Sequence, residues 1–371
     1  MVVFITIPWF LPAYKAGGPI QSVANLVSRF DDCIEYRIFC GDTDLDGTKL
    51  AGIETGKWVP YNENTMVWYA EKDISKTLTA QAELLKPEVL FIIGIFSWHY
   101  NIVPLLFCKA QKKILSVRGM LHPGALTQKK MKKRVFLDLL RLSGIRKKIS
   151  FHATDEDEAI YIKYEFGKKA RVNIAANYGK KINPAAPLFK EAGSLKLITV
   201  ALISPMKNHL TVLEGLADCE GNIEYDIYGP VKDAAYWELC LAMIAVLPAN
   251  IRVQYRGETA PENISGILEQ YHVFIMPSKS ENFGHAIYEA LSAGKPVITS
   301  RNTPWNGLQK ARAGMNTETT AESIADAINF FAEADNEVYS RFAKGALDYI
   351  AEKISIEKTD EQYRRLFFNH A

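Results

Sequence analysis

The sequence predicts an α/β protein made of two doubly wound parallel sheets, one in each half of the chain. Short β-branched or apolar runs alternate with longer segments of helical period, which is typical of parallel sheets joined by crossover helices. The 371 residues are too many for one ordinary hydrophobic core. The stretch from Asn177 to Ser194 holds Gly, Pro and small residues without a sustained period, so we expect it to link the halves.

Strand candidates occur along both halves. In the first half they are Val2 to Ile7, Tyr36 to Cys40, Met66 to Tyr69, Val89 to Phe96, Lys113 to Val117 and Ser150 to Ala153. In the second half they are Leu197 to Ala201, Ile223 to Tyr228, Ile251 to Tyr255, His272 to Met276 and Pro296 to Ser300. Ligands of open α/β sheets bind outside the carboxyl ends of the strands. We therefore expect functional residues just after strands, and a deep cleft between two facing sheets.

Three features exclude other classes of protein. The stretch from Val89 to Cys108 carries no formal charge, but its polar residues and Pro104 argue against a membrane span. The 5 cysteines form no Cys-x-x-Cys pair, so we expect neither a disulfide framework nor a cysteine zinc site, and we expect a reducing cytosol. No basic residue precedes the first apolar run, so we expect no signal peptide.

The charge is divided unevenly between the halves. Overall, 44 Lys+Arg stand against 42 Asp+Glu, which gives +2. Residues 1–182 hold 27 Lys+Arg and 18 Asp+Glu, giving +9, and the remainder holds 17 and 24, giving −7. The segment from Lys109 to Lys148 alone has 13 basic residues and a single acid, Asp138. Such a cluster is either a solvated helix face or a surface that meets an anionic partner.

Two glycines after the first strand are candidates for phosphate binding. Gly17 and Gly18 precede Pro19, a favourable first residue of a helix. Glycine lets the backbone approach a ligand closely, and the free N–H groups at a helix start attract phosphate. The dinucleotide fingerprint Gly-x-Gly-x-x-Gly is absent here, and a plain turn remains the alternative for a lone Gly-Gly pair.

Two carboxylates mark the second half. Glu281 lies in an expected loop and Glu289 on the helix that follows it, within a strand, loop, helix and strand unit. Such a pair can accept hydrogen bonds from the hydroxyls of two sugar rings. The backbone N–H groups of Phe283, Gly284 and His285 at the helix start can face negative charge. A capping carboxylate plus a solvated glutamate is the simpler alternative for an isolated pair.

The segment PSKSENFGHAIYEALSAGKPVIT resembles the Glu-x7-Glu signature of retaining glycosyltransferases with the GT-B fold, family 4 of the glycosyltransferase classification. Similar motifs of that family are AYKAGGPIQSVANL, RGMLHPGALTQKKMKKR, FHATDEDEAIYI, SPMKNHLTVLEGL and the TPW of residues 303–305. The resemblance implies two facing Rossmann-like domains with a deep inter-domain cleft. The acceptor-binding domain would comprise residues 1–182 and 354–371, with the last stretch crossing back, and residues 183–353 would bind the nucleotide sugar.

The resemblance also implies roles on the donor side. Glu289 would bind the ribose hydroxyls of the nucleotide, and Glu281 would bind a hydroxyl of the donor sugar. The N–H groups of Phe283, Gly284 and His285 would line the sugar and the diphosphate.

Positive charge at the diphosphate is implied to replace a metal ion. Gly17 and Gly18 would contact the diphosphate from the first domain, and Lys207 would neutralise it. Negative charge develops on the departing oxygen, so Lys207 and Glu281 are the catalytic candidates. We expect no metal and no other cofactor.

Two positions depart from the family pattern. Leu202 stands where the family has an Arg five residues before its Lys, and Arg256, just after a strand, is a candidate substitute. Arg118 replaces the His that precedes Gly119 in the acceptor loop, and we expect it to meet a phosphate. His99 follows a strand and is a third acceptor-side candidate, although a satisfied loop histidine is the alternative.

The basic tract predicts a peripheral contact with an anionic membrane through Lys129, Lys130, Lys132 and Lys133. A nucleic-acid partner is not expected, because the aromatic residues are not interleaved with the basic ones. A solvated helix face is the alternative.

The resemblance thus implies a retaining glycosyltransferase of hexosyl or N-acetylhexosaminyl type that acts in bacterial polysaccharide biosynthesis. The expected partners are a nucleotide-diphosphate sugar, UDP-linked, and a glycan or lipid-diphosphate-linked acceptor. The expected location is the cytoplasm, at the inner face of the membrane. Alternatives are a non-catalytic sugar-nucleotide-binding subunit, suggested by Leu202, and a GT-B-fold sugar-nucleotide epimerase.

Overall fold

The computed structural model describes residues 1–29, 33–126, 130–180, 182–184 and 187–368. It has two compact units, Met1–Tyr178 with Ile356–Ala371, and Gly179–Ser355. These junctions differ from the expected bounds at 182 and 354. Tyr178 still belongs to the first unit, because its ring stacks on Tyr363 at 5.2 Å and its hydroxyl donates to Asp360 at 2.7 Å.

The first unit contains an eight-stranded sheet of order β3-β4-β2-β1-β5-β6-β7-β8. Neighbouring strands are parallel except β3 and β4, which form an antiparallel pair at one edge. The strands are β1 Val2–Thr6, β2 Glu35–Gly41, β3 Trp58–Asn62, β4 Thr65–Ala70, β5 Val89–Ile93, β6 Lys112–Ser116, β7 Ser150–Ala153 and β8 Val172–Ile174.

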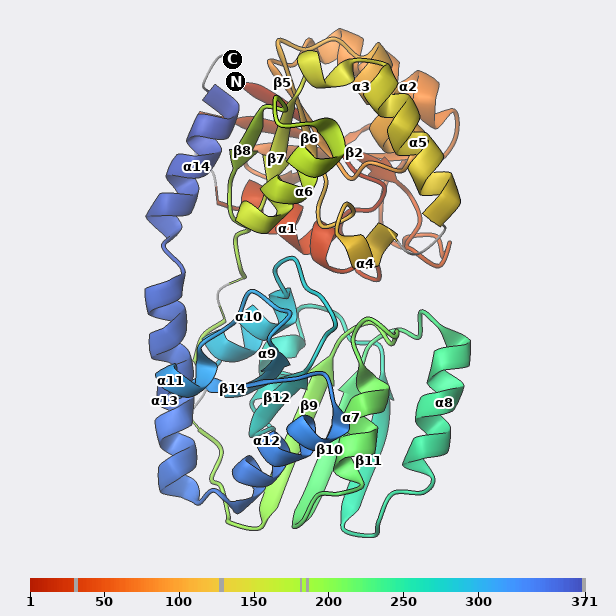
Figure 1. Cartoon of the computed structure of the whole chain (residues 1–371). Helices are drawn as coiled ribbons and strands as arrows, with labels where there is room; N and C mark the ends of the chain where they lie inside the picture. The colour runs from red at the N-terminus through yellow and green to blue at the C-terminus, as the bar shows by residue number, and fades with distance from the viewer. Residues whose placement is uncertain (30–32, 127–129, 181, 185–186, 369–371) are drawn as a thin grey trace. The chain divides into compact units, whose positions relative to one another are not determined.

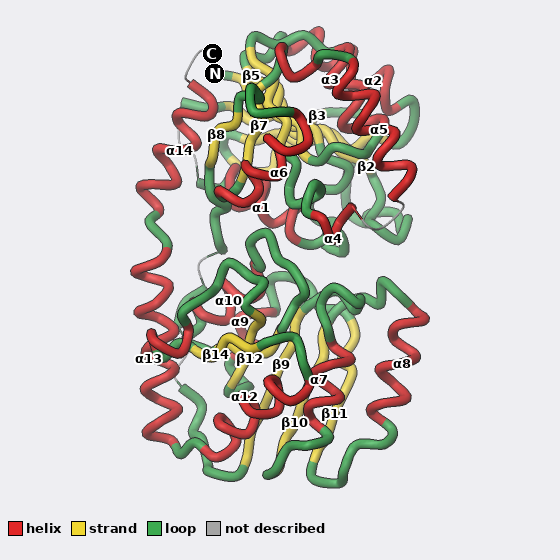
Figure 2. Tube along the Cα trace, in the orientation of Figure 1, coloured by secondary structure: helices red, strands yellow, loops and turns green. Residues whose placement is uncertain are grey.

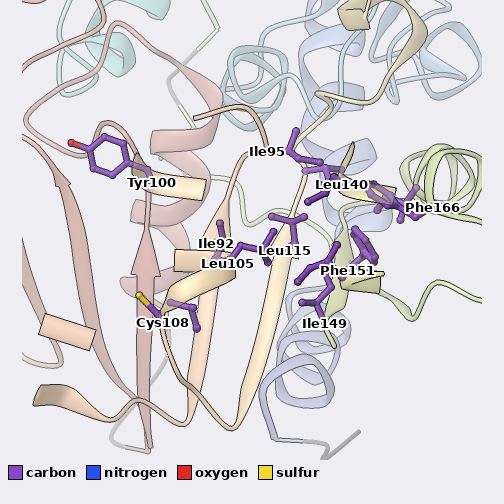
Figure 3. Close-up of a cluster of buried hydrophobic side chains, with 14 of the residues drawn as sticks. Ile92, Ile95, Tyr100, Leu105, Cys108, Leu115, Leu140, Ile149, Phe151 and Phe166 are labelled. Atoms are coloured by element: carbon purple, nitrogen blue, oxygen red, sulfur yellow. The ribbon is translucent and has the colours of Figure 1, made fainter. Parts of the chain in front are cut away.

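Helices cover both faces of this sheet (Figure 1; Figure 2). They are α1 Gly18–Val27, α2 Ile74–Leu85, the π-helix η1 Trp98–Ile102, α3 Val103–Phe107, α4 Pro123–Leu126, α5 Lys130–Leu142, the 3-10 helix η2 Ile145–Lys147, α6 Glu156–Phe166 and α14 Ile356–Phe368. The central strand β5 is buried on both sides, as expected in a parallel sheet. Its Phe91 packs with α1 and α14, whereas Ile92 packs with the cluster under α2, α3, α5 and α6 (Figure 3).

The second unit contains a six-stranded sheet, all parallel, of order β11-β10-β9-β12-β13-β14. Its strands are β9 Ser194–Val200, β10 Asn222–Tyr228, β11 Ile251–Gly257, β12 Val273–Met276, β13 Val297–Ser300 and β14 Gly314–Thr317. Its helices are α7 His209–Leu216, α8 Ala234–Ile244, α9 Ile264–Leu268, α10 His285–Ser292, α11 Leu308–Ala311, α12 Ala321–Glu333 and α13 Asn336–Lys353. One core joins the sheet to α7, α8 and α12, and the other joins it to α9, α10, α11 and α13.

The predicted fold class is confirmed, and every strand candidate corresponds to a strand. Three further strands were not predicted. β3 contains Pro60 and is largely exposed, β8 has 3 residues, and β14 begins with Gly314, so none has the apolar run of a typical strand. The uncharged stretch from Val89 to Cys108 forms β5, η1 and α3, and the described residues contain no helix long and apolar enough to span a membrane.

Candidate functional site

The loops after β9 and β12 meet at the carboxyl edge of the second sheet, where these strands are neighbours. The Lys279 N–H donates to the Met206 carbonyl at 2.8 Å and ties the two loops together. Next to this bond, Lys207 and Glu281 form an ion pair, with side chains 21% and 11% exposed. The two catalytic candidates, 74 positions apart in sequence, are therefore in direct contact.

The start of α10 presents uncapped N–H groups to the same edge. Gly284 is the N-cap residue, and no side chain caps the helix. Its φ of 74° lies in the left-handed region that favours glycine, and a Cβ there would come within 3.3 Å of the Trp305 Nε1 atom. The Trp305 indole donates to the Phe283 carbonyl, and the two rings lie 5.5 Å apart. Trp305 of the TPW motif thus holds the loop at Phe283 through contacts that do not use the N–H groups of the loop. N–H groups at a helix start are suited to bind an anion.

Glu289 lies on the second turn of α10, between two residues of the core that joins the second sheet to α9, α10, α11 and α13. It is 5% exposed, and no described residue donates a hydrogen bond to its carboxylate. Burial raises the pKa of Glu289 to about 7, and the positive charge of Lys180 lowers the pKa slightly against that effect. A buried carboxylate without donors is energetically costly, and a ligand hydroxyl pair would relieve that cost.

Lys180 is a site residue that the sequence reasoning missed. It lies in the segment expected to be only a linker, and its ammonium donates to the Pro261 carbonyl at 3.3 Å. Because it is the charge that acts on Glu289, it belongs to the surroundings of the expected ribose site. A lone lysine in a Gly- and Pro-containing stretch carries no motif that would have revealed it.

Arg256 is engaged away from the Lys207 and Glu281 pair. It is the last residue but one of β11, an edge strand two positions from β9, and its Nε donates to Asp226 of β10 at 2.7 Å. Asp226 is 6% exposed and also accepts from the Tyr271 hydroxyl at 2.5 Å. The structure therefore does not bring Arg256 to Lys207, and its role as substitute for the Arg missing at Leu202 stays a prediction.

In the first unit, the glycine loop before α1 has a conformation that requires glycine. Gly17 has φ 71° and ψ −129°, and a Cβ there would meet no atom within 4 Å. Gly18 begins α1, and no side chain caps that helix. The Gly17 N–H donates to the Tyr14 carbonyl at 3.0 Å, but the space beside its Cα is open, which suits the close approach of a ligand.

An Asp-x-Asp-x-Asp run follows β2 directly and holds this glycine loop, so the expectation that no Asp-x-Asp motif stands after a strand was wrong. Asp44 is 5% exposed and accepts from the N–H groups of Tyr14 and Lys15 at 3.0 and 3.1 Å. Asp46 pairs with Lys15 at 2.8 Å, and Asp42 pairs with Lys49. These carboxylates are occupied by lysines and backbone N–H groups, so the run is a scaffold for the loop.

Arg118 is placed differently from expectation. We expected it to meet a phosphate, but it is 8% exposed and donates to the Asn177 side chain. The buried Glu158 accepts from the Gly119 N–H and is attracted by Arg118. Arg118 thus braces Asn177 beside the acceptor loop, and its expected contact with a phosphate stays a prediction.

His99 is exposed at the carboxyl end of β5, on η1. Its Nδ1 shares a hydrogen bond of 2.7 Å with the Ser75 hydroxyl of α2. The ring is therefore oriented by a neighbour but leaves its other nitrogen toward solvent. Its acceptor-side role stays a prediction.

No cluster of three or more His, Cys, Asp or Glu side chains that could hold a metal ion occurs within the described ranges. The expected independence of the reaction from metals stays a prediction.

Residues 184–348 match the family model described as Glycosyl transferases group 1. The matched residues are less than half of the chain. Sucrose synthase of Melioribacter roseus is 27% identical over 148 residues, which are 36% of this chain and 18% of that protein. Sucrose synthase of Nitrosomonas europaea is 30% identical over 113 residues, 28% of this chain and 14% of that protein. The matched stretch is thus less than a fifth of either relative.

Solved structures match over nearly the whole chain. Sucrose-phosphate synthase from Thermosynechococcus elongatus has a TM-score of 0.71 at 16% identity, covering 99% of both chains. Anabaena HepE in complex with UDP and glucose has a TM-score of 0.71 at 15% identity, and the match covers 99% of both chains. A variant of S. aureus TarM in complex with Fondaparinux, alpha-GlcNAc-glycerol and UDP has a TM-score of 0.72 at 13% identity. The match covers 99% of this chain and 100% of that one. The chain therefore has the GT-B fold.

Proposed function

We propose that the protein is a retaining glycosyltransferase that moves a hexosyl or N-acetylhexosaminyl group from a nucleotide-diphosphate sugar to a hydroxyl of a glycan or lipid-linked glycan. The observation that carries the proposal is the buried carboxylate of Glu289, which no described residue donates to and which lies in the segment that matches the group 1 model. Two adjacent ribose hydroxyls would supply the missing donors, each as a charge-assisted hydrogen bond.

A UDP-linked donor is the favoured choice. The HepE structures contain UDP-glucose or UDP with glucose, and the TarM structure contains UDP. Those ligands belong to proteins of 13–15% identity. They motivate the first donors to be tried and leave the sugar open.

The ion pair between Lys207 and Glu281 sets the expected order of events on donor binding. The diphosphate carries more negative charge than one carboxylate and draws Lys207 away. Glu281 is then free to accept from a hydroxyl of the donor sugar. The N–H groups at Phe283, Gly284 and His285, at the start of α10, would face the diphosphate as charge develops on the leaving oxygen. In front-face displacement that leaving oxygen takes the acceptor proton, so no side chain is required as a base.

The first unit supplies the remaining proposed contacts. The Gly18 N–H would face the diphosphate, and Gly17, whose own N–H is donated to the Tyr14 carbonyl, would allow its close approach. Asp44 holds this loop in place. Arg118, Gly119 and His99 are the acceptor-side candidates.

The test is a transfer assay with a panel of UDP sugars and lipid-diphosphate acceptors. We expect turnover that Lys207→Ala lowers strongly, while Lys310→Ala on α11, a control, leaves it unchanged. If the protein binds UDP sugars but transfers none, a non-catalytic subunit replaces our proposal. Conversion of a UDP sugar to its epimer without acceptor would favour the epimerase. Unchanged binding and turnover in Lys207→Ala would refute the diphosphate assignment.

A peripheral contact with an anionic cytoplasmic membrane is also proposed. Lys129 lies outside the described residues, and the side chain of Lys130 is not described. Lys132 is exposed. Lys133, in contrast, donates to the Ala125 carbonyl at 2.6 Å and lies 5.1 Å over the Phe96 ring, so it turns inward. Neutralising Lys132 should weaken sedimentation with anionic vesicles, and neutralising Lys133 should have less effect.

A further inference from the structure

Helix α5 has two apolar faces, and only one of them packs against the protein. Leu137 and Leu140 are 1% and 6% exposed and face the core under the first sheet. The opposite face, which we name the outer stripe, consists of Met131, Val135, Leu139 and Leu142. These side chains are 79%, 56%, 63% and 84% exposed.

The spacing of the outer stripe makes it continuous. Its members are four, four and three residues apart, so they lie one above another on the same side of an α-helix. Isolated exposed apolar residues are ordinary on protein surfaces, but an aligned set of four large ones indicates an interaction surface.

Basic residues border the stripe. Lys132 on α5, and Lys147 and Lys148 just beyond it, are exposed. Arg134 is half exposed, although it also pairs with Asp138 at 3.7 Å and with Glu165 at 3.6 Å. An apolar stripe bordered by exposed cations is the pattern of a helix that lies in the interface of an anionic bilayer.

We propose that α5 binds anionic membranes by inserting the outer stripe between lipid headgroups, while its basic border contacts the phosphates. The inference rests on the membrane contact proposed above, and it adds that apolar insertion contributes in addition to charge. A second copy of the chain is the less favoured occupant, because apposed α5 helices would bring Lys132 and Arg134 close to their own like charges. A nucleic acid is also disfavoured, since the stripe has no aromatic residue for stacking.

The test compares vesicle binding at low salt and at about 1 M salt, where screening reduces the range of surface charges to about 3 Å. The probes are vesicles of phosphatidylcholine alone and with phosphatidylglycerol. We expect the parent to sediment with anionic vesicles and to retain part of that binding at high salt. The double variant Leu139→Ser, Leu142→Ser should bind anionic vesicles at least about tenfold more weakly than the parent. It should also lose the binding that resists high salt. Lys132→Gln should lower low-salt binding about fivefold and spare the salt-resistant part.

Controls separate this inference from the proposed reaction. Leu239→Ser on α8, a similarly exposed leucine at 57%, should change nothing. Leu139→Trp should shift its fluorescence to the blue on anionic vesicles, which reports insertion even if the serine variant folds poorly. Thermal stabilisation by UDP reads the donor site and should be the same in all these variants. Its absence from every one would count against the proposed function and leave the membrane inference standing.

Any one of three results with vesicles would overturn the inference. The parent does not bind anionic vesicles, the serine variant binds as the parent does, or Leu139→Trp shows no blue shift. A parent dimer in analytical ultracentrifugation that the serine variant dissociates would likewise overturn it in favour of a second copy.

Discussion

Two buried glutamates, one in each unit, have the same chemistry and opposite surroundings. Glu158 of α6 is 3% exposed and accepts from the Gly119 N–H, the Thr154 N–H at 2.7 Å and the Thr154 hydroxyl at 3.0 Å. Glu289 of α10 is 5% exposed and accepts from no described donor. Burial raises the pKa of both carboxyls, but only the Glu158 carboxylate has backbone donors that offset the effect.

The difference separates a structural carboxylate from one suited to bind a ligand. Each bond that Glu158 accepts comes from the protein, so the residue holds the acceptor loop against α6. Glu289 has no such partner among the described residues, and its oxygens remain able to accept from a ligand. Burial alone therefore does not identify a functional acid, whereas burial without donors does so far better.

The largest expected effect is on donor binding by Glu289→Ala. Two charge-assisted hydrogen bonds to the ribose would be lost, at about 1.5–3 kcal/mol each. UDP affinity measured by calorimetry should fall by two orders of magnitude or more, while Glu158→Gln retains it. Equal UDP affinity in Glu289→Ala and the parent would remove Glu289 from the site.

Glu158→Ala tests the structural half of the comparison. It leaves two backbone N–H groups buried without an acceptor, at about 1–3 kcal/mol each, so the free energy of unfolding should drop by about 2–6 kcal/mol. Urea denaturation measures this directly. A loss below the error of that experiment would mean that the acceptor loop does not depend on Glu158.

Glu289 should make stability depend on pH in a defined direction. Its pKa is about 7 in the folded chain against 4.5 in the unfolded chain, so the unfolded state loses its proton first. The contribution of Glu289 to the free energy of unfolding is therefore most favourable at low pH. It becomes less favourable as the pH rises from about 4.5 to about 7. Glu289→Gln should therefore be about 3 kcal/mol more stable than the parent near pH 8 and similar to it near pH 4. UDP affinity of the parent should fall below about pH 7, where the carboxylate takes up its proton.

The smallest expected effect concerns metal removal. The carboxylates of Asp42, Asp44 and Asp46 are occupied by lysines and backbone N–H groups, as Glu158 is by its donors. EDTA should therefore leave turnover and UDP binding unchanged. Activity that EDTA abolishes and Mn²⁺ restores would contradict the metal-independent mechanism.

Much of the framework was predictable because it depends on local patterns. The central strands of both sheets are apolar runs. Glu281 and Glu289 stand in a strand, loop and helix unit whose boundaries are visible in the sequence. The contact between Lys207 and Glu281 follows from β9 and β12 being neighbours, and that strand order is not written in either segment.

Other features depended on tertiary contacts or were overlooked. The basic tract was interpreted by its charge, but Lys133 turns toward Phe96 and Arg134 pairs with Glu165, so part of the charge serves the fold. Leu139 stands between Leu137 and Leu140 in the sequence, and only the packing shows that it faces outward while they are buried. The aspartates after β2 were visible in the sequence, but their partners, Lys15 and Lys49, were not.

Helix α14 has a consequence for synthesis of the chain. Its Tyr363, Leu366 and Phe367 are at most 3% exposed and belong to the core of the first unit, with Tyr178 stacked on Tyr363. A ribosome that has finished residue 178 has therefore not yet made the side chains that close this core. At about 5–20 residues per second, the missing helix follows about 10–35 s later, after the second unit has emerged. The unit made first is thus completed last, and a nascent chain would expose the seat of α14 for that interval.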